Sequence, residues 1–194
     1  MHFVWYQSPN HPELATAAGD ERSKRYNVGG FWPAAFFDGF YRAPTVSVLD
    51  SFYGVYDNMV GQARALTTVL EMSLDSATTR LDSTKLSIGV HITSTDSTVN
   101  AMNSLMLVAV IYEDSTPYRS QVGGDTAYAR YCARCVIGDT WGVPLRLHFG
   151  TDFDTVLNTS LGTWNRSRLG AAVFVQDTSS LRVLQSVGKL RFGR

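Results

Sequence analysis

The hydrophobic period of the chain changes near residue 70, and this change limits the folds it can adopt. Before residue 70, apolar residues three and four apart predict an amphipathic helix that begins at Asp50 or Ser51. After it, apolar and polar residues alternate as in half-buried strands, at Leu70, Met72 and Leu74 and again at Leu86, Ile88, Val90 and Ile92. We therefore divide the chain into residues 1–69 and residues 70–194.

The second part predicts an antiparallel β-sandwich. Two stretches, Ser104–Tyr112 and Gly170–Val175, are apolar on both faces, as central strands are. Half-buried strands are expected at Leu145, Leu147 and Phe149, and at Leu181 and Val183. About seven short strands separated by turn residues are typical of an immunoglobulin-like or fibronectin-like sandwich. Together with the helical first part, this predicts an α+β fold.

The first part predicts alternating strands and helices. His2–Tyr6 is a compact apolar run, and Asn10 can cap a helix that ends near Gly29. Ala34–Phe37 predicts a short buried strand, with Thr45–Leu49 as its hairpin partner. The amphipathic helix then follows, and its apolar stripe must pack on a sheet. The stripe comprises Phe52, Val55, Tyr56, Met59, Val60, Ala63 and Leu66.

The composition narrows the possible partners and locations. Lysine plus arginine balance aspartate plus glutamate at 17 each, so no overall positive charge favours nucleic acid. No apolar run approaches the roughly 20 residues of a membrane-spanning helix. The charged fraction is only 18%, with many serines and threonines, which favours an exported protein. Met1–Gln7 lacks the basic start of a signal peptide, so we expect a mature or truncated form of an exported chain.

The two cysteines, Cys132 and Cys135, have the spacing of a redox pair but lie in a strand-rich region. Residues i and i+3 of a regular strand point to opposite faces, so such a pair neither forms a bond nor attacks a disulfide together. Two structural thiols are the favoured interpretation, and a local disulfide across a turn is the alternative. Zinc would need further ligands at spacings that the sequence lacks. We expect neither a metal nor a cofactor.

The segment Gly29–Gly39 includes Phe31-Trp32-Pro33-Ala34 and ends in Asp38-Gly39. It resembles the cis-proline loop of thioredoxin-like proteins, which implies that Pro33 is a cis proline and that the following helix is the last helix of that fold. Thioredoxin chemistry needs a Cys-x-x-Cys at the start of a helix that precedes this proline. No such helix precedes Pro33 here, so we expect an incomplete thioredoxin-like segment without its redox centre.

A wider resemblance covers most of the chain. Its most distinctive block is Gly170–Asp177, a buried strand that closes in Val-Gln-Asp, followed by Val183–Ser186. Together with Gly30–Ala34, Leu107–Asp114, Tyr128–Ile137 and Trp141-Gly142, this pattern resembles the Omp-twenty-eight-related outer membrane protein family. The resemblance implies an exported protein with a thioredoxin-like part and a C-terminal sandwich. The chain departs from the family by lacking the N-terminal cysteine pair and by carrying Cys132 and Cys135.

We expect a non-enzymatic structural or binding protein outside the cytoplasm, either extracellular or in the cell envelope. Its partner is expected to be another copy of the chain or an envelope protein, bound through an exposed sheet edge. The first alternative is a thiol-disulfide redox protein that uses Cys132 and Cys135 near Pro33. The second is a carbohydrate-binding sandwich that uses the aromatic side chains of Tyr128, Trp141 and Trp164.

Overall fold

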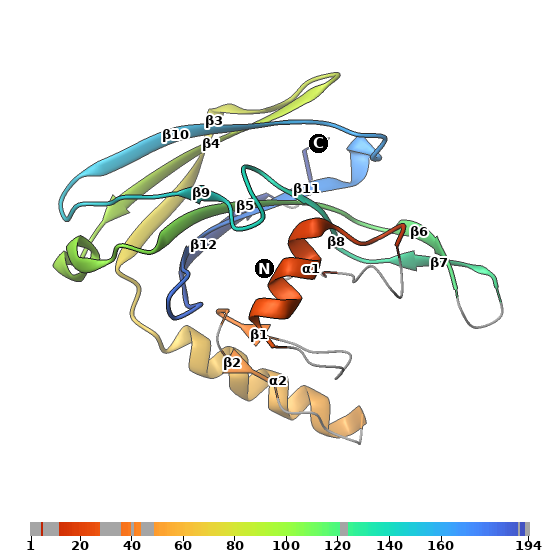
Figure 1. Ribbon diagram of the computed structural model, residues 1–194, viewed down its shortest axis with the longest axis horizontal. Coiled ribbons are helices and arrows are strands. Elements are labelled where there is room, and N and C mark those ends of the chain that lie inside the picture. The colour runs from red at the N-terminus through yellow and green to blue at the C-terminus, as the bar shows by residue number, and fades with distance from the viewer. Residues whose placement is uncertain are drawn as a thin grey trace.

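The computed structural model describes residue 5 and residues 12–27, 36–39, 41–43, 49–120, 124–189 and 191–192. These residues form an α+β fold in which antiparallel strands predominate. In Figure 1 a three-stranded sheet lies above a five-stranded one, and the helices lie on the far side of the larger sheet.

The smaller sheet has the order β10-β4-β3. Its strands are β3 (Leu70–Leu81), β4 (Lys85–Ser94) and β10 (Asp152–Ser160). The alternating residues predicted β3 and β4 correctly, although β3 runs seven residues beyond the alternation that ends at Leu74. The register of β3 against β4 shifts between Asp75 and Arg80.

The larger sheet has the order β12-β11-β5-β8, and the short strand β9 also pairs with β5. Its strands are β5 (Leu105–Glu113), β8 (Cys132–Val136), β9 (Val143–Pro144), β11 (Leu169–Asp177) and β12 (Val183–Lys189). The two stretches that are apolar on both faces form β5 and β11 at the centre of the sheet. Almost every residue of these two strands is buried, because both faces of the sheet are covered.

The main hydrophobic core lies between the two sheets. The smaller sheet contributes side chains such as Ile88, Val90 and Leu157, and the larger sheet contributes Ile111 and Val173. Because these strands alternate, every second side chain enters this core.

The strand expected at Leu145, Leu147 and Phe149 is wrong. The regular pairing ends at Pro144, and only the amide of Leu145 still donates to the Leu105 carbonyl. Residues 145–148 carry no strand structure, yet Leu145 and Leu147 are buried in the main core, whereas Phe149 is exposed. The alternation of apolar residues therefore reflects the burial of alternate side chains in a loop, and not a strand. Leu181 also lies outside a strand, in the turn before β12, with a φ of 65°.

The outer face of the larger sheet is covered by the helix α1 (Ala17–Arg25). Its cap is Thr16, whose hydroxyl accepts a hydrogen bond from the Gly19 amide at 3.0 Å. The expected cap Asn10 and the expected end at Gly29 lie outside the described residues. A second apolar cluster contains Val108, Val110, Ala133 and Phe174, and Trp5 packs against it.

The short strands β1 (Phe36–Phe37) and β2 (Tyr41–Arg42) form a hairpin. Asp38 and Gly39, both at positive φ, reverse the chain between these two strands. Of the expected partner Thr45–Leu49, only Leu49 lies within the described residues, and it begins α2. Residues 44–48 and Pro33 lie outside the described residues. The predicted amphipathic helix is confirmed as α2 (Leu49–Arg64), although no side chain described in it is fully buried.

Three smaller elements complete the described fold. The hairpin of β6 (Thr116–Arg119) and β7 (Thr126–Ala129) extends to the right in Figure 1. The 3₁₀ turns are η1 (Ser97–Ala101) and η2 (Arg166–Arg168). Neither helix in the described part of the chain is long and apolar enough to cross a membrane.

Candidate functional site

The two cysteines lie on β8 as free thiols in different surroundings. Cys132 is buried in a small cluster with Leu14 and Ala129, whereas Cys135 packs against the main core between the sheets. Burial raises the pKa of both thiols, against a smaller opposing effect of Arg134. A raised pKa keeps a thiol protonated and unreactive at neutral pH. Their relation to Pro33 lies outside the described residues.

The three aromatic side chains considered for carbohydrate binding make separate contacts. Trp141 lies over the guanidinium of Arg22, and Trp164 packs against the main core with Arg134 near its ring. Tyr128 is exposed on β7. Among the described residues no ring contact joins these three, so they do not form the shared platform that would stack on a sugar.

The edges of the two sheets differ in how open they are to another strand. β3 and β12 carry register shifts, and β8 is short, with a further shift in its pairing to β5. Shifts and short length protect an edge against pairing with another chain. β10 has no such feature: its register against β4 is unbroken from Asp152 opposite Thr93 to Ser160 opposite Lys85. No strand of the described chain pairs with its other side.

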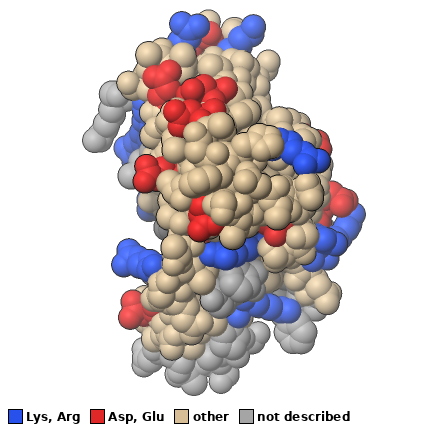
Figure 2. All heavy atoms as spheres, turned by 90° about the vertical axis from the view of Figure 1, so that its left-hand side faces the viewer, with Lys and Arg blue, Asp and Glu red and all other residues tan. Residues whose placement is uncertain are grey.

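The outward-facing side chains of β10 change in character along the strand. Asp152 and Asp154 lie at its start, and Val156, at its centre, is 44% exposed. Glu71 on β3 lies across Thr93 from Asp152, which groups three carboxylates at this end of the smaller sheet. Figure 2 shows acidic side chains gathered in its upper part, the level at which Figure 1 places this sheet. The outer face of β10 is therefore acidic at one end and neutral at the other.

His91 on β4 contacts this acidic group. Its Nδ1 lies 2.8 Å from Oδ1 of Asp154, and this hydrogen bond raises the pKa of His91. A raised histidine pKa means that the contact favours the protonated ring, so His91 gains positive charge beside Asp154 as the pH falls through its pKa.

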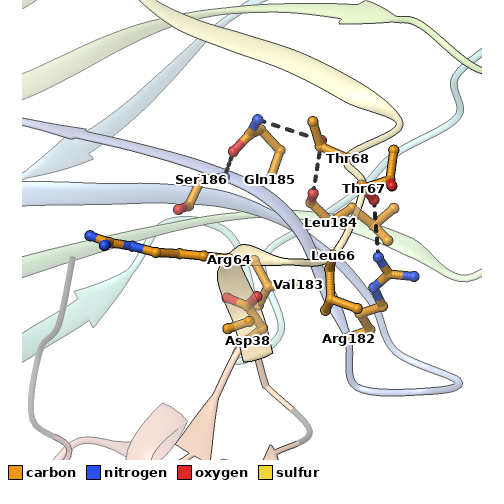
Figure 3. A pocket seen from close by; sticks show the side chains of 11 residues that line it. Asp38, Arg64, Leu66, Thr67, Thr68, Arg182, Val183, Leu184, Gln185 and Ser186 are labelled. Atoms are coloured by element: carbon orange, nitrogen blue, oxygen red, sulfur yellow. Dashed lines mark hydrogen bonds between the residues drawn. The ribbon is translucent and has the colours of Figure 1, made fainter. Parts of the chain in front are cut away.

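A small open cavity lies where the N-terminal part meets the sandwich (Figure 3). It has a volume of about 240 Å³. The turn after β1, the end of α2 and the start of β12 form its walls, and its polar lining residues include Asp38, Arg64, Thr67, Arg182 and Gln185. In Figure 3 the side chains of Arg64 and Arg182 point to opposite sides.

Arg182 and Asp38 are the charged groups of this cavity that burial affects. Nη2 of Arg182 donates to the Thr67 carbonyl at 3.2 Å, but the buried Nε of Arg182 has no hydrogen-bond partner within the described part of the chain. Burial raises the pKa of Asp38, although Arg182 acts in the opposite direction. The arrangement can hold a small polar group but contains no nucleophile beside a base. The sequence did not predict this cavity, because Asp38 and Arg182 lie far apart in the chain. Of its lining, only the Asp38-Gly39 turn was recognisable from the local sequence.

No protein-family model and no curated protein matches the chain. Among solved structures, HBP35 of Porphyromonas gingivalis is similar with a TM-score of 0.70 and 11% sequence identity. The match covers 95% of this chain, which spans 60% of the HBP35 chain. A domain of the outer membrane lipoprotein Omp28 from Porphyromonas gingivalis matches with a TM-score of 0.44 and 13% identity, over 65% of this chain and 90% of that one. At these identities the likeness to HBP35 shows a shared fold.

Proposed function

We propose that this protein is a non-enzymatic binding or structural module of the cell envelope or extracellular space, and that it assembles with its own copies through β10. The edge of β10, which is unbroken in register and pairs with no other strand of the described residues, is the observation that carries this proposal. The resemblance of the sequence to the Omp-twenty-eight-related family supports the location. Burial raises the pKa of the Cys132 and Cys135 thiols, which argues against redox catalysis.

The two parts of the chain fit two known architectures. Two antiparallel sheets around one core, in the orders β10-β4-β3 and β12-β11-β5-β8, fit an immunoglobulin-like sandwich. The β1–β2 hairpin with its Asp38-Gly39 turn and the helix α2 fit the end of a thioredoxin-like segment. In this assignment the sandwich carries the assembly edge.

The sequence of β10 is compatible with antiparallel pairing to a second copy of itself. In the register centred on Val156, Asp154 lies opposite Asn158 and Asp152 opposite Ser160. The carboxylates are then at opposite ends of the pair, whereas like charges directly opposite each other would destabilise it. The exposed Val156 side chains meet at the two-fold axis. Such an isologous contact joins two three-stranded sheets into one continuous sheet.

Light scattering of the purified chain over a wide concentration range tests this proposal. We expect the mass to rise with concentration for the wild type and to stay that of a monomer for Val156→Lys, since a lysine on an edge strand opposes pairing. Ser186→Lys on the shifted edge β12 is the matched control and should assemble like the wild type. Circular dichroism establishes that both variants fold.

A wild type that remains monomeric throughout would overturn the proposal. Assembly that persists unchanged in Val156→Lys would place the contact elsewhere and exclude β10.

A further inference from the structure

Arg22 is a buried cation on the face of α1 that packs against the larger sheet. The residue is only 3% exposed, although arginine is among the residues least often buried. Its guanidinium lies 4.7 Å from the ring centre of Trp141, 5.5 Å from that of Trp5 and 5.8 Å from that of Phe174. Three aromatic rings therefore surround the charge, an arrangement that stabilises a cation through the negative faces of the rings.

The hydrogen bonds of this guanidinium are incomplete. Nη1 donates to Oε1 of Gln176 at 3.0 Å, and Gln176 is itself fully buried, with its amide held by the Tyr26 hydroxyl and the Leu181 carbonyl. Nε and Nη2 have no hydrogen-bond partner among the residues that the structure describes. These two nitrogens form one edge of the guanidinium, with N–H bonds that point in parallel, which is the edge that binds a carboxylate in a bidentate manner.

No acidic oxygen of the described residues lies within 4.0 Å of the Arg22 nitrogens. Burial lowers the pKa of Arg22, and Tyr26 and the more distant Asp139 offset this only in part. Asp139 is instead bonded to the backbone amide of Trp141, at 2.7 Å. Buried polar groups are nearly always paired, and a buried charge without a partner lowers the stability of the fold. An anion bound at the Nε–Nη2 edge of Arg22 would therefore be stabilising.

The turn that places Trp141 over Arg22 is held rigidly. Gly142 has a φ of 101°, and a Cβ at this position would lie 2.4 Å from the Leu107 carbonyl oxygen, so only glycine fits there. Trp5 and Trp141 are both partly exposed. The guanidinium therefore lies one ring beneath the surface, beside the apolar cluster of Val108, Val110 and Phe174.

We infer that the Nε–Nη2 edge of Arg22 is a binding site for a small monocarboxylate with an apolar body. The carboxylate forms two parallel hydrogen bonds with the edge, and the apolar body lies among the surrounding rings after Trp5 or Trp141 shifts outward. A planar carboxylate matches the fixed fork of a guanidinium, and the apolar surroundings favour a ligand whose remaining surface is apolar. This inference is independent of assembly through β10.

Benzoate is the probe, with neutral benzamide as its control for shape. Tryptophan fluorescence and the melting temperature of the full chain are followed during titration at constant ionic strength. We expect benzoate to change the fluorescence in a saturable way and to raise the melting temperature, because a ligand that binds only the folded state stabilises it. Benzamide, which has no carboxylate, should do neither.

The variant Arg22→Met keeps an unbranched side chain among the rings and removes the charge. Without ligand, removal of the buried charge and loss of the Nη1 donor to Gln176 act in opposite directions on stability, so circular dichroism and a cooperative melt establish that the variant folds. It should bind benzoate at least about 30-fold more weakly, as expected for the loss of one buried charged partner. Arg25→Met is the matched control on the same helix, where Arg25 is exposed and donates to the Thr178 carbonyl.

Equal binding of benzoate by the wild type and Arg22→Met would overturn the inference, as would a wild type that shows no saturable response.

Discussion

The sandwich and the segment of β1, β2 and α2 are both amphipathic in sequence, but among the described side chains the sandwich buries its apolar residues more completely. Ile88, Ile111 and Val173 in the main core are all 0% exposed. The stripe of α2 has the correct helical spacing, yet its described members are half-buried, and Tyr53 on the same helix is 81% exposed. A periodic pattern therefore predicts which element forms but not how tightly it packs.

The difference arises from how each region satisfies its backbone. In the sandwich, strands far apart in the chain pair along most of their length, as β11 does with β5 from Leu169 opposite Glu113 to Asp177 opposite Leu105. The hairpin of β1 and β2 has only two residues in each strand. Such a short sheet cannot by itself cover a helix of four turns, and the described side chains of α2 are at most half-buried. We expect the stability of the molecule to reside in the sandwich.

The largest expected effect contrasts Ile88→Ala in the core with Val60→Ala on α2. Ile88→Ala leaves a cavity between the sheets and should lower the free energy of unfolding by about 2–5 kcal/mol. Val60 is half-buried, so Val60→Ala should cost less than about 1 kcal/mol. Urea denaturation measures both. Equal losses would mean that α2 is as firmly packed as the sandwich, which would remove the contrast between the two regions.

A second prediction contrasts glycine-to-alanine substitutions in the sandwich with one on α2. Gly142→Ala combines a positive φ with a clash against Leu107 and should cost about 1–3 kcal/mol. Gly61 on α2 has open space within 4 Å of where a Cβ would lie, so Gly61→Ala should raise the stability of that helix by about 0.5–1 kcal/mol. Gly150→Ala, at a φ of 73° with open space around it, isolates the cost of the backbone conformation alone. The melting temperature should be highest for Gly61→Ala, intermediate for Gly150→Ala and lowest for Gly142→Ala.

The sequence predicted the regular elements well and the contacts between distant segments poorly. Strands β3, β4, β5 and β11 and the helix α2 followed from the period of their apolar residues, because period is a local property. The sequence did not predict that Tyr41–Arg42 pairs with β1. This pairing is set by the positive φ of Asp38, which does not affect the period of the apolar residues. The buried Arg22 was also missed: its position on an otherwise polar helix suggests exposure, and the rings around it come from distant parts of the chain.

A smaller effect is expected at Asp177, where β11 leaves the sheet. Burial acts to raise its pKa, but hydrogen bonds from Ser104, Ser180 and Ser179 lower it to about 2. Because the folded pKa lies below the ordinary value of 3.8, the ionised form stabilises the fold above about pH 4, and this contribution disappears as the pH falls toward 2. Asp177→Asn should therefore cost about 1–2 kcal/mol at pH 7, after allowance for partial exposure.

The measurement is the difference in melting temperature between the wild type and Asp177→Asn as a function of pH. The difference should shrink below pH 4 as the wild-type carboxylate takes up a proton. A difference that stays constant with pH would mean that the hydrogen bonds of Asp177 do not depend on its charge.

The smallest effect is expected at Asp38, which joins the two regions because its carbonyl accepts a hydrogen bond from the Val183 amide at 2.8 Å. Burial raises the pKa of Asp38 despite the opposing effect of Arg182. A folded pKa above the ordinary value means that the fold favours the protonated carboxyl, so this group contributes less stability as the pH rises through that pKa. Asn tolerates the φ of 47° at this turn, so Asp38→Asn should melt slightly above the wild type at pH 7.

The advantage of Asp38→Asn over the wild type should vanish below about pH 4, where the wild-type side chain is neutral in both the folded and the unfolded state. Asp75→Asn is a useful comparison, because hydrogen bonds from Thr78 and Ala77 lower the pKa of Asp75 in the sandwich, and its substitution should have the opposite sign at pH 7. A lower melting temperature of Asp38→Asn at pH 7 would show that the attraction between ionised Asp38 and Arg182 outweighs burial. The junction would then hold the N-terminal part to the sandwich by charge, and the two regions would be coupled more strongly than their packing indicates.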